Sequence, residues 1–454
     1  MSSQLNPRGA YSLTVSEEEK LARSILGHIY RQYEIIDDPA IVDYVNKVGY
    51  RIVEGLEEPL FNYRFHVIKV DSYNAFAIPA GYIFVNSGLL AAMDSEEELA
   101  GILAHEIAHV NARHISQRIE KSKKIGWATM AGVAAGILIG AAGGGDAAQA
   151  VTTGSQAAGA AAQLSYSRDN EIQADQLGLI YLTNAGYGGE GLLKILRKMR
   201  TKQWFDTEQV PTYMRTHPAI DDRIIYLDGQ IAAAPNTTKA RSPEASDEFA
   251  RAHTYLITRY GDENLVLKHL QSELEKHPQE PMAHYRYGLI LARVGRNDEA
   301  IAHLRTAMEK RALDPYILRD FGRVYYLDGQ YQQSKKMLIT AHNKIPDDAE
   351  CGLYLGQTYM EMGLFDEASP VLQAIVKKHP GFTEAYYTLG QSLGKQGNLG
   401  DAHYYLGIYH TRKGDYKTAV VQYRNALKYV KDPDRRAIIE KRLKKFEKAL
   451  SKKR

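Results

Sequence analysis

The sequence predicts a mostly helical α+β protein, with a small sheet in its N-terminal half and an α-helical solenoid in its C-terminal half. Residues 63–70 (YRFHVIKV) and 82–85 (YIFV) are rich in β-branched and aromatic side chains, as strands are. The period of the solenoid is set by glycines that recur every 34 residues, at Gly288, Gly322, Gly356 and Gly390. A chain of 454 residues is long enough for two domains with separate cores.

The predicted helices of the first half begin at capping boxes. Ser16 with Glu19 marks an early helix, and Ser95 with Glu98 marks a helix that we expect to run from 95 to about 120. The uncharged segment 125–145, mostly alanine and glycine, is long enough to span a membrane but lacks the strongly apolar residues that drive insertion. We therefore expect a helical hairpin there, near the active site or a membrane surface.

The linker and the repeats follow. Residues 229–246 are rich in alanine, proline, serine and threonine and have no apolar period, so we place a domain at 1–228, a linker at 229–246 and a repeat domain at 247–454. The 34-residue pattern resembles tetratricopeptide repeats, in which small residues let paired helices approach closely. After Gly397 the phase slips by 17 residues, and the basic C-terminus is expected to be a capping helix with a solvated face rather than an anion site.

Charge and cysteine content exclude several classes of function. With 57 lysines and arginines against 54 aspartates and glutamates, the chain has no field strong enough to predict a nucleic-acid partner. The single cysteine, Cys351, excludes an intramolecular disulfide and leaves any metal to histidine and carboxylate ligands. The first twelve residues lack the basic and apolar regions of a secretory signal, so export is not visible here.

The motif HEIAH predicts a metal site. His105 and His109 lie four residues apart, on one face of a helix, where both imidazoles reach one ion. Glu106 is placed to accept a proton from water at the metal and to pass it to the leaving amine of a peptide. Such histidine pairs also occur on solvated helix faces, so the motif alone leaves that alternative open.

A catalytic zinc requires a third protein ligand and an open position. In SRDNEIQADQLG, Glu171 and Asp175 share one helical face. We expect Glu171 to be the third ligand and Asp175 to hold a ligand histidine through its distal ring nitrogen. The alternative for the acidic pair is an exposed helix face.

Four motifs in order, NAFAIPAGYIFVNSGLL, HEIAHVNARH, NEIQAD and THPAIDDR, resemble the β-barrel assembly-enhancing proteases, which are relatives of the HtpX and CAAX-prenyl-protease type. The resemblance covers nearly the whole chain. It implies a gluzincin-like peptidase domain joined to tetratricopeptide repeats, with one Zn²⁺ per chain held by His105, His109 and Glu171 and with Glu106 as the catalytic base.

The resemblance also implies roles that the residue types alone do not. The segment Asn74 to Gly81, including Ala75, Phe76 and Ala77, would form the substrate edge of the cleft, although an ordinary loop and core strand is the alternative. His217, before Pro218, would occupy the open zinc position and keep the enzyme latent, and Arg223 would stabilise the oxyanion. Both could instead have structural roles at the start of a helix. Relatives often carry glycine where this sequence has Ala80.

Together these observations predict a zinc metalloendopeptidase that cleaves misfolded or stalled outer-membrane proteins in envelope quality control. The repeats would recruit polypeptide substrates or the assembly machinery, peripheral membrane contact is allowed, and the resemblance implies the periplasm. One alternative is a latent or non-catalytic repeat-based chaperone or adaptor, since such repeats bind peptides without zinc. Another is a cytosolic or inner-membrane-associated peptidase of the same chemistry.

Overall fold

The computed structural model describes residues 13–121, 166–205, 212–233 and 243–451. The chain divides into two compact units, Met1–Asp262 and Glu263–Arg454, and each is treated by itself. The hairpin expected at 125–145 and residues 234–242 of the expected linker lie outside the described residues. No helix in the described ranges is long and apolar enough to cross a membrane.

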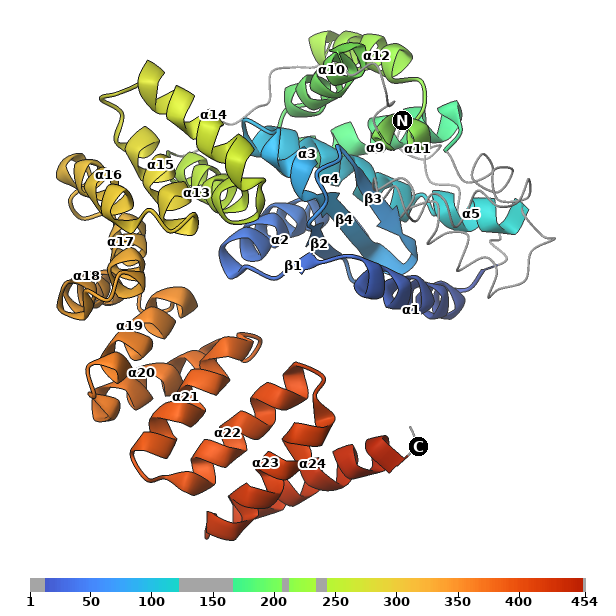
Figure 1. Cartoon of the computed structure of the whole chain (residues 1–454). Helices are drawn as coiled ribbons and strands as arrows, with labels where there is room; N and C mark the ends of the chain where they lie inside the picture. The colour runs from blue at the N-terminus through green and yellow to red at the C-terminus, as the bar shows by residue number, and fades with distance from the viewer. Residues whose placement is uncertain (1–12, 122–165, 206–211, 234–242, 452–454) are drawn as a thin grey trace. The chain divides into compact units, whose positions relative to one another are not determined.

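The first unit is a set of helices around a four-stranded sheet (Figure 1). Its elements are α1 Val15–Gln32, β1 Ile35–Ile36, α2 Pro39–Glu54, β2 Arg64–Ile68, β3 Ala75–Ile78, the 3-10 helix η1 Pro79–Gly81, β4 Tyr82–Asn86, α3 Ser87–Ala91, α4 Glu96–Asn111, α5 His114–Lys121, α9 Arg168–Asn184, α10 Glu190–Phe205, α11 Thr212–Thr216, α12 Ile220–Ala233 and α13 Pro243–Tyr260.

The strand order is β1-β2-β4-β3, with β2 parallel to β4 and both outer strands antiparallel to their neighbours. The two strands predicted at 63–70 and 82–85 are thus the central pair, and β3 forms one edge. Phe65 on β2 packs so closely against α2 that a Cβ at Gly49 would lie 2.4 Å from its ring. On the opposite face, His66, Phe84 and Phe76 stack across three strands.

Burial of His66 makes the stability of this unit depend on pH. Its ring is half-buried between Phe84 and Tyr82, its Nε2 has no hydrogen-bond partner among the described residues, and burial together with the charge of Arg64 lowers its pKa to about 4. Between that pKa and the unfolded value of about 6.5, the unfolded chain binds a proton that the folded chain does not. The stability gained by burying the neutral His66 ring is therefore fully present above about pH 6.5 and is lost as the pH falls toward 4.

We expect wild-type stability to fall between pH 6.5 and 4 by up to about 3 kcal/mol more than that of His66→Phe, which keeps the stacking. Urea unfolding followed by tryptophan fluorescence measures this difference, because both tryptophans of the sequence, Trp127 and Trp204, precede Glu263, where the second unit begins. A wild-type to variant difference that does not change with pH would show that His66 makes no such contribution.

Helix α4 runs through the interior of the first unit, where it packs against α9, α10 and the sheet. It approaches α10 so closely that a Cβ at Gly101 would lie 2.6 Å from the backbone of Leu192. Acidic residues occupy its first turn, where their negative charge interacts favourably with the positive end of the helix dipole. Glu96 accepts hydrogen bonds from Tyr44 and Tyr187. These contacts fix the axial position of the helix that carries HEIAH.

Three local predictions were wrong. The helix expected from 95 to about 120 is two helices, because Arg113 adopts a left-handed backbone with φ of 55° and turns the chain between α4 and α5. The first capping box is Thr14 with Glu17, two residues before the predicted pair. Ser95 does precede α4, but its side chain makes no capping hydrogen bond.

The second unit is a series of paired helices (Figure 1). They are α14 Glu263–Lys276, α15 Pro281–Arg293, α16 Asn297–Lys310, α17 Pro315–Leu327, α18 Tyr331–Lys344, α19 Ala349–Glu361, α20 Phe365–Lys378, α21 Thr383–Lys395, α22 Leu399–Arg412, α23 Tyr416–Tyr429 and α24 Pro433–Ser451. The predicted fold class, a small sheet and helices followed by helical repeats, is confirmed.

Each periodic glycine lies where two helices of a pair touch. A Cβ at Gly322 would lie 2.6 Å from Leu338, and one at Gly356 would lie 2.7 Å from Leu372. The 17-residue slip has a similar basis: α22 packs against both α21 and α23, and a Cβ at Gly407 would meet Tyr423. One helix therefore closes one pair and opens the next.

The predicted domain boundary differs from the observed division. Helix α12 extends to Ala233 and α13 begins at Pro243, so both ends of the expected linker are helical. Helix α13 packs against α2, and Arg259 at its C-terminal end pairs with Asp38 at 2.6 Å. These contacts place residues 247–262, predicted to open the repeat domain, in the first unit.

Candidate metal and active site

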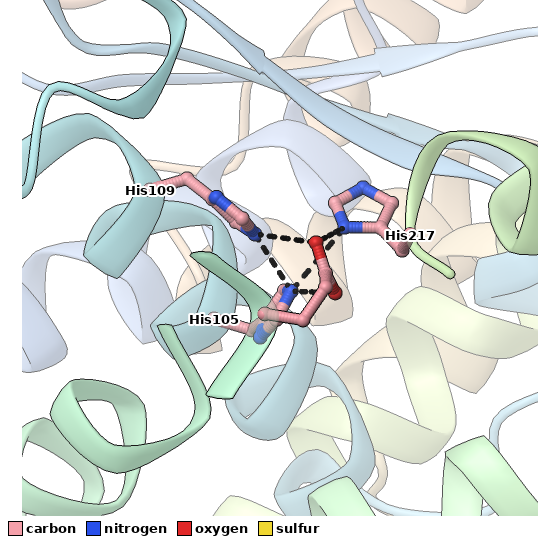
Figure 2. Close-up of side chains that lie close together, drawn as sticks. His105, His109 and His217 are labelled. Atoms are coloured by element: carbon pink, nitrogen blue, oxygen red, sulfur yellow. Dashed lines mark hydrogen bonds and ion pairs between the residues drawn. The ribbon is translucent and has the colours of Figure 1, made fainter. Parts of the chain in front are cut away.

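Four buried side chains from three parts of the sequence meet in the first unit. His105, His109, Glu171 and His217 each offer a ligand atom, and these atoms all lie within 4.8 Å of one another. Figure 2 shows the imidazoles of His105, His109 and His217 turned toward a common centre. The structure thus brings together the three predicted ligands and the predicted switch histidine.

The spacing of these atoms fits a zinc ion. The Nε2 atoms of His105 and His109 lie 3.0 Å apart, and the two carboxylate oxygens of Glu171 lie 3.4 Å from them, Oε2 from His105 and Oε1 from His109. Ligands arranged tetrahedrally around zinc at roughly 2.0–2.1 Å lie about 3.3 Å from one another. Two imidazoles and one carboxylate also form a known ligand set of catalytic zinc sites.

Helix α9 supplies the acidic side of the site. Ser167 and Asn170 form a capping box that starts this helix, and its first turn presents Glu171 to the histidines. Asp175, one turn later, lies 2.9 Å from His105 Nδ1, the ring nitrogen that faces away from His109. The geometry agrees with the role predicted for Asp175, because a carboxylate there accepts the Nδ1 proton and leaves Nε2 for a metal.

Arg223 on α12 also lies at the site, buried to 1% exposure. Its Nε and Nη2 each donate to Asp175 at 2.8 Å, and its Nη1 lies 2.6 Å from Glu171. The guanidinium therefore holds two carboxylates in place. These contacts account for its position, and its contribution to oxyanion stabilisation stays a prediction.

The charge balance of the site favours a divalent cation. Among the described residues, three fully buried carboxylates, those of Glu106, Glu171 and Asp175, surround one guanidinium, that of Arg223, so protons on the histidines or a bound cation must balance the remaining negative charge. Although burial acts to raise it, the charges of His217 and Arg223 hold the pKa of Glu171 well below its ordinary value. Burial lowers the pKa of His109 and leaves a neutral imidazole, the form that binds metal. A buried excess of negative charge is costly unless a cation neutralises it.

Glu106 lies beside the cluster, next to the ring nitrogen of His217 that does not contact Glu171. Its side chain is 0% exposed, and neither carboxylate oxygen has a hydrogen-bond partner among the described residues. The nearest charged neighbour is His217, whose Nε2 lies 3.6 Å from Glu106 Oε1. Burial raises the pKa of this carboxyl. An unsatisfied buried carboxylate beside a ligand cluster is suited to accept a proton from a bound molecule.

Two tyrosines hold the His217 segment. The Tyr213 ring stacks on His217 with centroids 4.2 Å apart, and Tyr166 contacts His217 at 5.0 Å and His109 at 3.8 Å. The backbone N–H of Tyr166 donates to Thr216 at 3.0 Å. Sequence reasoning missed both rings. The four-residue spacing of Tyr213 and His217 was the only available signal for the first.

The predicted substrate edge is strand β3 and the turn after it. Ala75, Phe76 and Ala77 are buried, and the Phe76 ring stacks on Phe84, so these side chains belong to the core. Asn74 is also fully buried, and neither atom of its amide has a partner among the described residues. Gly81 has φ of 85° in the turn. Among the described residues β3 pairs with a strand on one side only, so the backbone of its outer edge and the Asn74 amide are the candidate groups for contact with a peptide.

Comparison with known proteins identifies both parts of the chain. Residues 41–231 match the model of peptidase family M48, and residues 267–316 and 325–393 match two tetratricopeptide-repeat models. The predicted combination of a metallopeptidase domain with these repeats is confirmed. Ala80 has φ of 65°, a left-handed conformation that glycine adopts without strain.

Two curated relatives and one solved structure illustrate the range of similarity. The β-barrel assembly-enhancing protease of Yersinia pestis is 27% identical over 61% of this chain and 56% of its own length. The mitochondrial metalloendopeptidase OMA1 of Schizosaccharomyces pombe is 27% identical over 40% of this chain and 50% of its own. The chain spans about half the length of these relatives. The crystal structure of MamA matches 36% of this chain and 96% of its own, with 18% identity and a TM-score of 0.32.

Proposed function

From the M48 peptidase domain and tetratricopeptide repeats of this chain, we propose that it is a zinc-dependent endopeptidase. The observation that carries the proposal is the buried cluster of His105, His109 and Glu171, with an unsatisfied Glu106 beside it. In this proposal the first three hold one zinc ion, which supplies Lewis-acid chemistry at the peptide carbonyl.

The remaining steps belong to the side chains. Glu106 takes a proton from the attacking water and delivers it to the leaving amine. Asp175 keeps His105 in the tautomer with Nδ1 protonated, and Arg223 keeps Asp175 and Glu171 oriented toward the histidines. Arg223 supplies a positive charge from α12 at the site, so in this proposal it also stabilises the negative charge of the oxyanion.

The substrate in this proposal is an extended polypeptide that pairs with the outer edge of β3, where no described strand lies. Strand addition places a peptide backbone along an unpaired edge, and sequence-tolerant binding of this kind suits a protease of misfolded chains. The Asn74 amide, buried and unpartnered, would exchange hydrogen bonds with the substrate backbone. Burial without a partner is costly for an amide, and a bound peptide removes that cost.

We place this activity in the bacterial envelope, where the protein would act in quality control of outer-membrane proteins. The relatives named β-barrel assembly-enhancing proteases support this setting. The repeats, which in other proteins present a concave surface to peptides, would recruit substrate or the assembly machinery. Contact with the periphery of a membrane is compatible with this location. Fractionation of cells measures this, because the zinc-dependent cleavage of casein should be recovered in the periplasmic fraction.

His217 is proposed to keep the enzyme latent. Its Nδ1 lies 3.1 Å from Glu171 and 3.4 Å from His105 Nε2, at the position that a water or a substrate oxygen needs. We expect His217→Ala to cleave casein about tenfold faster or more than wild type, because each tenfold change requires only about 1.4 kcal/mol of stabilisation of the closed state. A zinc chelator should abolish cleavage by both proteins.

The matched control is His28→Ala, which removes a histidine on α1 of the same unit and should leave the rate unchanged. An unchanged or lower rate in His217→Ala, with zinc still bound, would contradict the latency proposal. Cleavage that survives complete removal of zinc would contradict the proposed function. If His217→Ala binds zinc but cleaves nothing, the rival reading of a non-catalytic repeat-based adaptor is favoured instead.

A further inference from the structure

A line of hydrogen-bonding groups leads away from the proposed metal centre behind His109. The Nδ1 of His109 lies 2.9 Å from the Nδ1 of His114, and the Nε2 of His114 lies 2.9 Å from Oε1 of Gln173. His114 is 0% exposed, and Gln173 is half-buried. Neither residue belongs to the ligand cluster, and the proposed reaction gives neither of them a role.

The order of donors and acceptors along this line follows from the metal end. A neutral imidazole carries one proton, and His109 turns its Nε2 toward the cluster, 3.0 Å from His105 Nε2. If Nε2 binds a metal, Nδ1 must carry the proton and donate it. The Nδ1 of His114 must then accept, which leaves the proton of His114 on Nε2, where it is donated to Gln173.

We propose that His114 and Gln173 are positioning residues that fix the tautomer and orientation of His109 for metal binding. This inference rests on the proposed function. The two ligand histidines then have different supports, because His105 is held by the carboxylate of Asp175 and His109 by a neutral pair. The neutral pair adds no charge to a pocket that already buries three carboxylates against one guanidinium.

The backbone places His114 for this role. The left-handed turn at Arg113 ends α4 and starts α5, so that His114 turns back onto the ring of His109 instead of continuing along the helix. Arg113 is held there by hydrogen bonds to Glu18 and to the carbonyl of Leu13. The first two turns of α9 carry Glu171 and Gln173, so one segment supplies a ligand and the end of the relay.

Zinc affinity tests the proposal without reference to activity. Gln173→Met removes the acceptor at nearly constant size, whereas Gln173→Glu keeps one. We expect Gln173→Met to weaken zinc binding by about tenfold and His114→Phe by about 10- to 100-fold, the range for loss of an outer hydrogen-bond partner. Gln173→Glu should bind at least as tightly as wild type. Gln176→Met, on the same helix and also half-buried, is the matched control and should have no effect. Competition with a chromophoric chelator measures each affinity.

A double-mutant cycle separates a relay from a packing effect. The relay predicts that Gln173→Met weakens zinc binding in the wild-type background and has no further effect once His114 is Phe. The absorption spectrum of bound Co²⁺ should also change in His114→Phe and remain unchanged in Gln173→Glu. Because Gln173 is only half-buried, its variants keep the fold, and thermal unfolding of the metal-free proteins checks this point.

The outcomes are distinct. Equal and additive losses in the cycle, or no loss in Gln173→Met, would overturn the relay while leaving the metal site intact. Failure of the wild-type chain to bind zinc at all would overturn the proposed function and the relay with it. A loss in Gln173→Met that Gln173→Glu shares would assign the effect to packing and would also overturn the relay.

Discussion

Glu106→Gln is expected to reduce casein hydrolysis by at least about a hundredfold, within the range of 10²–10⁴ that a general base contributes. The replacement has nearly the same size and removes only the ability to take a proton. Glu106 has no hydrogen-bond partner among the described residues, so the change breaks no hydrogen bond and alters only the contact with His217, 3.6 Å away. The rates should be measured in the His217→Ala background, where latency does not mask the difference.

Zinc content provides the internal control for this variant. Glu106 is not one of the three proposed ligands, so Glu106→Gln should bind one zinc per chain, as wild type does. A rate near that of the parent, with zinc bound, would remove Glu106 from the mechanism. Loss of zinc together with loss of activity would instead assign Glu106 a role in metal binding.

Glu171→Gln is expected to have the largest effect on the metal itself. The carboxylate is the only anionic ligand proposed, and it lies 3.4 Å from the Nε2 atoms of both His105 and His109. Loss of a direct ligand should weaken zinc binding by more than the roughly 10- to 100-fold typical of an outer partner. This variant should therefore lose both zinc binding, measured by chelator competition, and casein cleavage.

Asp169→Asn is the matched control for Glu171→Gln. It makes the same chemical change in the same first turn of α9, at an exposed position. We expect its zinc affinity and its rate to equal those of wild type. Tight zinc binding by Glu171→Gln would show that another residue completes the site.

Much of the site could be predicted from the sequence because helical spacing is local. The four-residue separation of His105 and His109, and that of Glu171 and Asp175, each places two side chains on one face before any tertiary contact is known. A catalytic zinc needs three protein ligands, which predicts that these two helix faces lie against each other. The structure brings them together, with Glu171 beside both histidines and Asp175 behind His105.

The residues that were missed depend on tertiary contacts that spacing does not encode. His114 approaches His109 only because Arg113 turns the chain, and nothing in the arginine side chain predicts a positive φ. Tyr166 reaches His109 and His217 from a different segment. A regular helix from 95 to 120, as predicted, would have carried His114 away from this contact.

The repeats and the domain boundary differ in how far the sequence could predict them, for the same reason. The repeats were predictable because one close contact, such as Gly322 with Leu338, recurs with the sequence period. The boundary before them was not, because α13 has an amphipathic pattern that also suits a repeat helix. Only its contacts with α2 and the pair of Arg259 with Asp38 assign it to the first unit.

Anomalous scattering from crystals at the zinc absorption edge would locate the metal. We predict one peak per chain at roughly 2.0–2.2 Å from the Nε2 atoms of His105 and His109 and from a carboxylate oxygen of Glu171. In the latent protein, His217 should approach the same peak. A zinc-loaded crystal with no peak among these side chains, or with the peak at other ligands, would contradict the proposed zinc site.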